Sequence, residues 1–344
     1  MNTTAIETTG VAAARHITTA DKFKSLLRRE FWENKGGFFW APIVAGGISV
    51  FFSLLGVIAS IFLVKEENIH IKDGDLAEVG HHLQTTEGLQ AIGFAGDMSL
   101  LGGIGLALLV MTFVVFFYAL GSLYDERKDR SVLFWKSLPV SDGQTVLSKV
   151  AWALFLAPLL AVGIGLVIGI GHWLIGGLGM VINGIPGASA FFTESHPFRV
   201  LGSAVSIIPL YAAWSLPAIG WLMFCSAWAR SKPFLWAVLV PIMAGALISW
   251  LDMLPGIEIP HEHVWYILLL RGLLSVIPMT WYANENVYGS LQSIEVDGPA
   301  DLARALDLTH GWNAFATVDL WVGVIVGVAF MIAAVRLRRW RDEG

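Results

Sequence analysis

Six long blocks of apolar residues constrain this chain more than any other feature of its sequence. A helix needs about 20 apolar residues to cross the ~30 Å hydrocarbon core of a bilayer. The blocks cover residues 38–64, 98–124, 151–175, 203–228, 234–254 and 313–335. Their lengths, and their lack of two-residue alternation, favour transmembrane helices over barrel strands. The sequence therefore predicts an all-α membrane protein with six transmembrane helices.

Composition agrees with this prediction. Only 14% of the residues are charged and 56% are hydrophobic, whereas soluble domains carry about 25% charged residues. We expect a multi-pass protein of the cell (inner or plasma) membrane. Its one cysteine, Cys225, lies in an apolar block and has no internal disulfide partner.

Lysine and arginine set the expected orientation, because cytoplasmic loops carry an excess of both. Seventeen of the 22 fall on one side if residues 1–37, the loop 125–150, the turn 229–233 and the tail are cytoplasmic. The other side holds five, which are Lys65, Lys72, Arg199, Arg271 and Arg304. Both termini are therefore predicted to be cytoplasmic.

These assignments divide the chain into three parts. Residues 1–37 form a cytoplasmic N-terminus, 38–335 the transmembrane domain and 336–344 a basic cytoplasmic tail. The transmembrane domain includes two outer loops, 65–97 and 255–312, and a cytoplasmic loop at 123–150.

The segment 264–280 is apolar enough to suggest a seventh span. A seventh span would place the basic tail outside and Arg271 near the bilayer centre, at a cost of about 2.5–3.5 kcal/mol. We interpret the segment as a re-entrant or interfacial helix between spans five and six, with a true span as the alternative.

Residues 20–33 have the pattern of a basic amphipathic helix. Phe23, Leu26, Leu27 and Phe31 recur at helical spacing among lysines and arginines. Thr19 is the predicted N-cap, since a threonine hydroxyl can accept from the first turn. Such a helix is expected to lie on the inner leaflet; packing on a partner is the alternative.

The motifs of common enzyme classes are absent. The sequence has no G-x-x-x-x-G-K-[ST] phosphate loop and no H-E-x-x-H zinc motif. No Ser/His/Asp set is legible, and spans one, two and four have no ionisable residue in their interiors. Ion-coupled transporters usually need such groups. We therefore expect a non-catalytic chain that takes energy from a partner, with no nucleic-acid partner.

The cytoplasmic loop 123–150 is charged first and then aromatic. An apolar ridge follows Arg130, formed by Val132, Leu133, Phe134, Trp135 and Leu138. Pro139 is expected to end this short helix, and Ser141 to cap a second helix over 142–150. Aromatic anchors with a charged rim are typical of interfaces. Phe134 and Trp135 could equally rest among lipid headgroups.

In order, the loop contains Glu126-Arg127, Ser131, Leu133, Leu138-Pro139-Val140-Ser141 and Lys149. This order resembles the loop between spans two and three of ABC-2-type permeases, the membrane subunits of ABC exporters. Phe134-Trp135-Lys136 stands where that family has a more aliphatic run, and no glycine precedes Ser131. The six spans, cytoplasmic termini, amphipathic helix and re-entrant segment are also similar to the family plan.

The resemblance implies a coupling helix that docks on an ATP-binding subunit. The implied docking residues are Glu126, Arg127, Arg130, Phe134, Trp135, Leu138 and Pro139. Two ATP-binding subunits, carrying ATP and magnesium, and a second copy or a related permease would be the partners, together with membrane lipid. No cofactor is implied on this chain, and the transported substrate is not specified.

Weaker patterns leave alternatives open. Tyr211, Trp214 and Ser215 in span four either line a pathway or pack against a neighbour. Ala161, Gly165 and Gly169 allow close helix approach, which favours packing within the chain over dimerisation.

Two rival functions also follow from sequence features. His261 and His263 beside Glu258 and Glu262 could form an outer-face enzyme or metal site, although we expect no metal there. A sensor or scaffold that signals through the inner loop is the other rival.

Overall fold

The computed structural model describes residues 18–66, 81–130, 140–254, 260–292 and 308–341. Within these ranges the chain forms helices and turns and no strand, which confirms the all-α prediction for them. The elements are α1 (Thr19–Glu33), η1 (Gly36–Trp40), α2 (Ala41–Glu66), α4 (Thr86–Gly121), α5 (Tyr124–Lys128), α7 (Asp142–Ala151), η2 (Trp152–Leu156), α8 (Ala157–Ile182), α9 (Ala190–Thr193), α10 (Pro197–Ser206), α11 (Ile208–Trp228), η3 (Leu235–Leu239), α12 (Val240–Asp252), α13 (His261–Trp265), η4 (Tyr266–Arg271), η5 (Leu274–Val276), η6 (Thr280–Ala283), α14 (Glu285–Gln292), η7 (Leu308–Ala316) and α16 (Val318–Arg341).

Six helical stretches are long and apolar enough to cross a membrane. They are Gly36–Leu63, Thr86–Lys128, Asp142–Ile182, Pro197–Trp228, Leu235–Asp252 and Val318–Trp340. Large apolar side chains on their outer faces are exposed, including Phe52, Phe62 and Ile325 at 65%, 64% and 69%. Apolar surface on this scale is unfavourable in water and marks contact with lipid or protein. The chain is therefore a multi-pass membrane protein.

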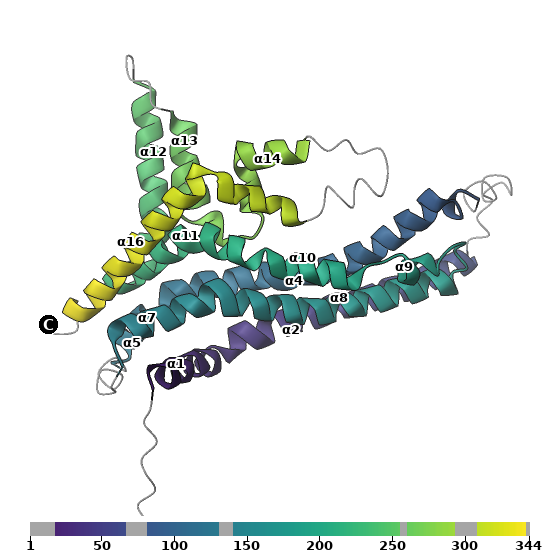
Figure 1. The fold of residues 1–344 in the computed structure, drawn as a ribbon, viewed down its shortest axis with the longest axis horizontal. Coiled ribbons are helices and arrows are strands. Elements are labelled where there is room, and N and C mark those ends of the chain that lie inside the picture. The colour runs from purple at the N-terminus through teal and green to yellow at the C-terminus, as the bar shows by residue number, and fades with distance from the viewer. Residues whose placement is uncertain (1–17, 67–80, 131–139, 255–259, 293–307, 342–344) are drawn as a thin grey trace, which may run out of the picture.

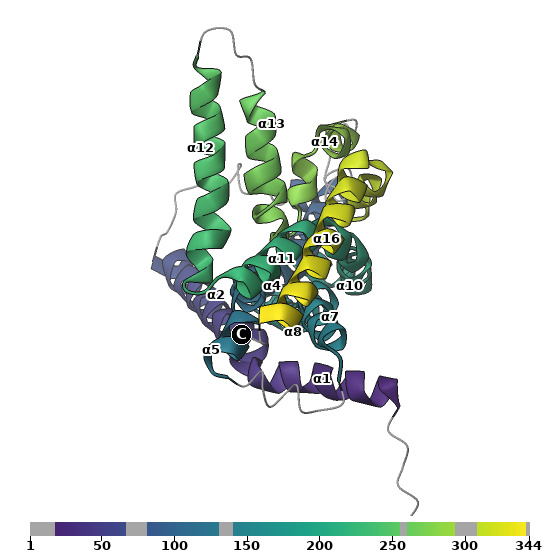
Figure 2. The same ribbon diagram turned by 90° about the vertical axis from the view of Figure 1, so that its left-hand side faces the viewer.

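The helices form two arms that diverge from one end. Figure 1 shows α2, α4 and α8 running side by side as a long arm, with α9 and α10 along it. The short arm consists of α12, α13, η4 and α16, with α12 and α13 at a steep angle to the long arm. Helix α11 lies at the junction, and its most apolar stretch is 78% buried, against 6% for the first span. The arms meet at the α1 end, formed by α1, α5, α7 and the C-terminal turns of α16 (Figure 2).

Small residues bring α4 and α8 into backbone contact. A Cβ atom added to Gly103 would lie 2.2 Å from the Gly169 nitrogen, and one added to Gly165 would lie 2.5 Å from the Ile104 Cα. A Cβ atom added to Gly169 would in turn lie 2.6 Å from the Leu100 carbonyl oxygen. The small-residue stripe of span three therefore packs inside the chain, as the sequence predicted.

Spans two and three are longer than their apolar blocks. Residues 86–97, which we had assigned to an outer loop, form the first turns of α4, and α8 continues to Ile182. The carboxylate of Asp97 is buried and accepts from the His196 backbone N–H, while Gly93 packs on Glu194. The start of α4 was missed because polar residues such as Asp97 interrupt its apolar pattern, whereas these turns are held by packing on the segment 190–199.

The last span also differs from its prediction. Residues 313–316 belong to the 3₁₀-helix η7, and α16 begins at Val318, where the Thr317 hydroxyl accepts from the Leu320 N–H at 3.4 Å. The helix then continues to Arg341. Residues 336–341 are therefore not a separate tail but the last turns of span six.

The capping of α1 and α7 was predicted in part. The N-cap of α1 is Thr18, not Thr19, because the Thr18 hydroxyl accepts from the Asp21 N–H and the Asp21 carboxylate accepts from the Thr18 N–H. Ser141 caps α7 as predicted, in the same reciprocal arrangement with Gln144.

The segment after span five turns back along it. Figures 1 and 2 show α13 beside α12, and the Trp265 indole donates to the Ser249 hydroxyl at 2.9 Å. At Arg271 the helix breaks into the short turns η5 and η6. Within residues 260–292 the structure has no helix of spanning length.

The α4–α8 contact gives a test of this packing. Gly103→Ala should lower stability by about 1–3 kcal/mol, because its methyl group would overlap the α8 backbone. Gly102→Ala, one residue away with open space around its Cβ, should be neutral or stabilise by up to ~1 kcal/mol. Thermal unfolding of both variants in detergent compares them, and equal midpoints would contradict the close approach.

Candidate functional site

A buried network of charged side chains lies at the α1 end of the molecule. It joins three parts of the chain that are distant in sequence, which are α1, the loop 123–150 and α16. Its members are Arg29 and Glu30 of α1, Glu126 of α5, Asp142 and Lys149 of α7, and Arg338 of α16.

Glu30 and Lys149 form the centre of this network. Glu30 is fully buried, and the Lys149 ammonium donates to both of its carboxylate oxygens, at 2.9 and 3.0 Å. The Tyr118 hydroxyl donates to the same carboxylate at 2.7 Å. Arg29 also donates to it. Buried charges are tolerated only when they are paired and hydrogen-bonded in this way.

Glu126 connects the centre to the loop and to the last helix. Its carboxylate lies 3.0 Å from the Lys149 ammonium, 3.1 Å from Arg29 and 2.6 Å from Arg338. Arg338 also reaches Asp142 at 3.1 Å. Since α5 and α7 are the two ends of the loop 123–150, the network ties both ends to each other, to α1 and to α16.

Arg127 fastens the same loop to span four. Its guanidinium donates to the backbone carbonyls of Ser226 and Ala229 at 2.6 and 3.0 Å. The Ser226 hydroxyl in turn accepts from the N–H groups of Leu123 and Tyr124. These contacts close the end of α11 against the start of α5.

The surrounding carboxylates favour the charged form of Arg29. Burial by itself would lower the pKa of Arg29, but Glu30, Glu33 and Glu126 together outweigh it and raise that pKa. Arg29 therefore stays protonated throughout the physiological range.

The predicted docking residues fall into three groups. Glu126 and Arg127 face the chain itself, as described above. Arg130 is exposed and has a positive φ of 55°. Phe134, Trp135, Leu138 and Pro139 lie outside the described residues, and no contact tests their docking role.

Sequence reasoning missed Glu30 and Arg338. Glu30 lies on the apolar face of its helix, three residues after Leu27 and four after Leu26, so a charge at this place was itself a sign of a buried partner. Arg338 is one of several arginines in the last turns of α16, and nothing in the sequence distinguishes it from the others.

A second buried ion pair lies between α11, η4 and α16. The Arg271 guanidinium stacks 3.7 Å over the Trp214 ring and donates to the Trp214 carbonyl at 2.9 Å. It pairs with Asp319 at 3.3 Å. Gly323 leaves the space that the guanidinium occupies, since a Cβ there would lie 2.1 Å from it. This pairing explains how an arginine is accommodated in an apolar segment.

The proposed pathway residues lie beside this pair. Tyr211, Trp214 and Ser215 are all buried within the chain, and the Ser215 hydroxyl donates to the Tyr211 carbonyl. A cavity of about 450 Å³ opens next to Arg271 and Asp319, walled by apolar side chains of α11, α12 and α16. The pathway role of the three residues stays a prediction.

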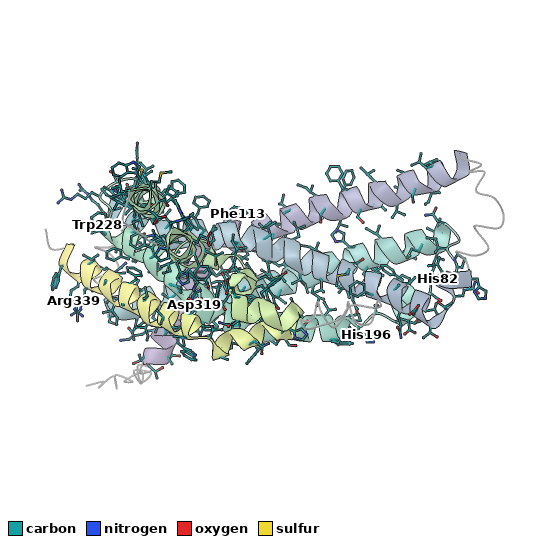
Figure 3. The ribbon with its side chains drawn as sticks, turned by 90° about the horizontal axis from the view of Figure 1, so that it is seen from above. His82, Phe113, His196, Trp228, Asp319 and Arg339 are labelled. Carbon is teal, nitrogen blue, oxygen red and sulfur yellow. The ribbon has the colours of Figure 1, made fainter. Side chains whose placement is uncertain are left out.

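The histidines that the sequence analysis assigned to the outer side do not gather into a metal site in the described part of the chain. No three His, Cys, Asp or Glu side chains there are placed to hold one ion. His261 instead pairs with Asp252 at 2.8 Å, and Glu258 lies outside the described residues. Figure 3 shows His82 and His196 toward the far end of the long arm, distant from Asp319.

No protein-family model, curated protein or solved structure matches this chain.

Removing Lys149 should destabilise the protein strongly. Lys149→Met leaves the buried Glu30 carboxylate short of its main partner, which costs about 3–5 kcal/mol for a broken buried pair. Lys128→Met removes the same charge from an exposed position of α5 and should change stability by less than ~0.5 kcal/mol. Thermal unfolding in detergent measures both, and Glu30→Gln combined with Lys149→Met should recover part of the loss. Equal unfolding midpoints for the two lysine variants would contradict a buried network.

Arg271→Lys should also be costly, although it keeps the charge. Lysine has no planar fork to stack on Trp214 while bonding its carbonyl and Asp319, so we expect a loss of about 2 kcal/mol or more. Arg199→Lys, whose side chain is 58% exposed, is the matched control. Monodispersity on size exclusion after stepwise heating compares the two, and identical curves would contradict the role given to Arg271.

Proposed function

We propose that this chain is the permease subunit of an ABC-2-type exporter. Two copies, or one copy and a related permease, would form the translocation pathway, and two separate ATP-binding subunits would dock on the loops 123–150. The chain itself would carry no catalytic residue. The observation that carries the proposal is the network through which both ends of this loop are bound to the rest of the molecule.

The network offers a mechanical reason for this arrangement. A permease must convert movement of a docked ATPase into movement of its spans. Through Glu126 and Lys149, a displacement of the loop reaches α1 directly, and through Arg338 it reaches α16. Arg127 extends the connection to α11. A force applied to the loop would therefore act on four of the six spans. Two of them are α4 and α8, from which α5 continues and into which α7 leads, and the other two are α11 and α16.

The conformation of Arg130 supports the resemblance of the loop. Its φ of 55° lies in the left-handed region that glycine adopts most easily. Arg130 immediately precedes Ser131, and the sequence departed from the family in having no glycine at this place. The backbone thus has the shape that a glycine would favour, even though the residue is an arginine.

The orientation follows from the same end of the molecule. We infer that the α1 end is cytoplasmic, because it collects most of the lysines and arginines. In Figure 2, α1 lies across this end of the molecule, and its direction suits an interfacial helix. The α13–η4 segment, which turns back beside α12, would be the re-entrant element entering from the outer side.

Co-purification with the cassette ATPase encoded nearest to this chain tests the proposal. The wild type in mild detergent should retain the ATPase, and Trp135→Asp or Pro139→Ala should release it, because each disrupts the predicted coupling helix. Trp340→Asp is the matched control, since Trp340 is 73% exposed at the same end and has no predicted docking role.

The outcomes separate the proposal from its rivals. If no cassette ATPase is retained, or if Trp135→Asp and Trp340→Asp behave alike, the coupling-loop argument is wrong. If the ATPase binds but reconstituted vesicles show no ATP-dependent transport, the chain is a scaffold or sensor rather than a permease.

A further inference from the structure

A groove runs between α7 and α16 at the α1 end. Its volume is about 400 Å³. The walls are apolar side chains from two sides, with Val146, Leu147 and Val150 on α7 and Val328, Met331 and Val335 on α16. Leu147 is 56% exposed, so this apolar surface is open to the surroundings of the protein.

Two arginines stand at the mouth of the groove. Arg336 and Arg339 are three residues apart on α16 and therefore lie on one face of it. Both are exposed, and neither makes an ion pair with any described residue. Arg338, between them in sequence, points the other way and forms ion pairs with Glu126 and Asp142. The last turns of α16 thus separate a structural arginine from two that are available to a ligand.

We propose that this groove binds an anionic phospholipid of the leaflet at the α1 end. The phosphate would sit between Arg336 and Arg339, and one acyl chain would lie along the apolar walls. The inference requires only that the chain spans a membrane and does not rest on the proposed transport function.

Charge and shape both favour this occupant. An arginine guanidinium matches a phosphate in geometry as well as in charge, and basic pockets between transmembrane helices commonly take anionic headgroups. A water-soluble anion would leave the apolar walls uncovered. A zwitterionic lipid would cover the walls but would place a positive choline group next to two arginines.

The site has a consequence for the ion-pair network. Helices α7 and α16 are already joined by the Asp142–Arg338 pair. A lipid in the groove would contact the same two helices from the other side. Bound anionic lipid should therefore stabilise the α1 end, because it binds the folded arrangement and not the unfolded chain.

Native mass spectrometry of the full chain in detergent, with added phosphatidylglycerol or phosphatidylcholine, tests the proposal. The wild type should retain phosphatidylglycerol preferentially. Arg336→Gln with Arg339→Gln should weaken its binding about 25-fold, at about 1 kcal/mol per arginine. Arg230→Gln with Lys232→Gln removes the same charge from exposed positions of the turn between α11 and η3, and should leave binding unchanged.

A second variant tests the apolar walls separately. Gly143 lines the groove, and the nearest atom to an added Cβ is 4.0 Å away. Gly143→Trp should therefore fold, fill the groove and reduce phosphatidylglycerol retention while both arginines remain.

Two results would overturn the site. One is equal retention of the two lipids by the wild type. The other is equal phosphatidylglycerol retention by the arginine pair variant and its control. If the arginine variant keeps its lipid but loses a co-purifying protein, the arginines serve an acidic protein surface instead. That loss would leave the Trp135→Asp test of the transport function unaffected, so the two ideas can fail independently.

Discussion

The contact between Glu30 and Lys149 is the interaction on which the α1 end of this molecule depends. Both groups are almost fully buried, so neither would be tolerated there without the other. Because each also has a second partner, the pair extends into a network that reaches α5 and α16. An end built in this way resists separate movement of its helices, and the two arms diverge beyond it.

The two arms are held by different forces. In the long arm, α4 and α8 approach so closely at Gly103 and Gly169 that their backbones touch, which van der Waals packing stabilises in a membrane. In the short arm, one arginine stacked on a tryptophan joins η4 to α11 and α16. The first contact is continuous and stiff. The second is a set of polar contacts within apolar surroundings, next to a cavity, in which Asp319 also accepts from Tyr266 and Asn284.

The ion-pair network at the α1 end gives the proposed function a structural basis. The loop 123–150 enters and leaves at the rigid end, so a partner that moves the loop moves several spans together. Glu126 illustrates the point, since the same residue belongs to the loop motif and to the ion-pair network. The arginines of α16 are likewise divided between two surroundings. Arg338 faces the network, and its neighbours Arg336 and Arg339 face outward.

The sequence by itself determined the membrane class, the six apolar spans and the close helix contact of span three, because these depend on composition, length and local spacing. It could not give the start of α4 or the end of α16, since distant residues hold those turns, Glu194 in the first case and Glu126 with Asp142 in the second. Nor could it show that Glu30 meets Lys149, or that Trp214 supports Arg271. These pairs are 119 and 57 residues apart in the chain. Only the tertiary structure decides such contacts, because a buried charge is satisfied by whichever partner the fold brings within reach.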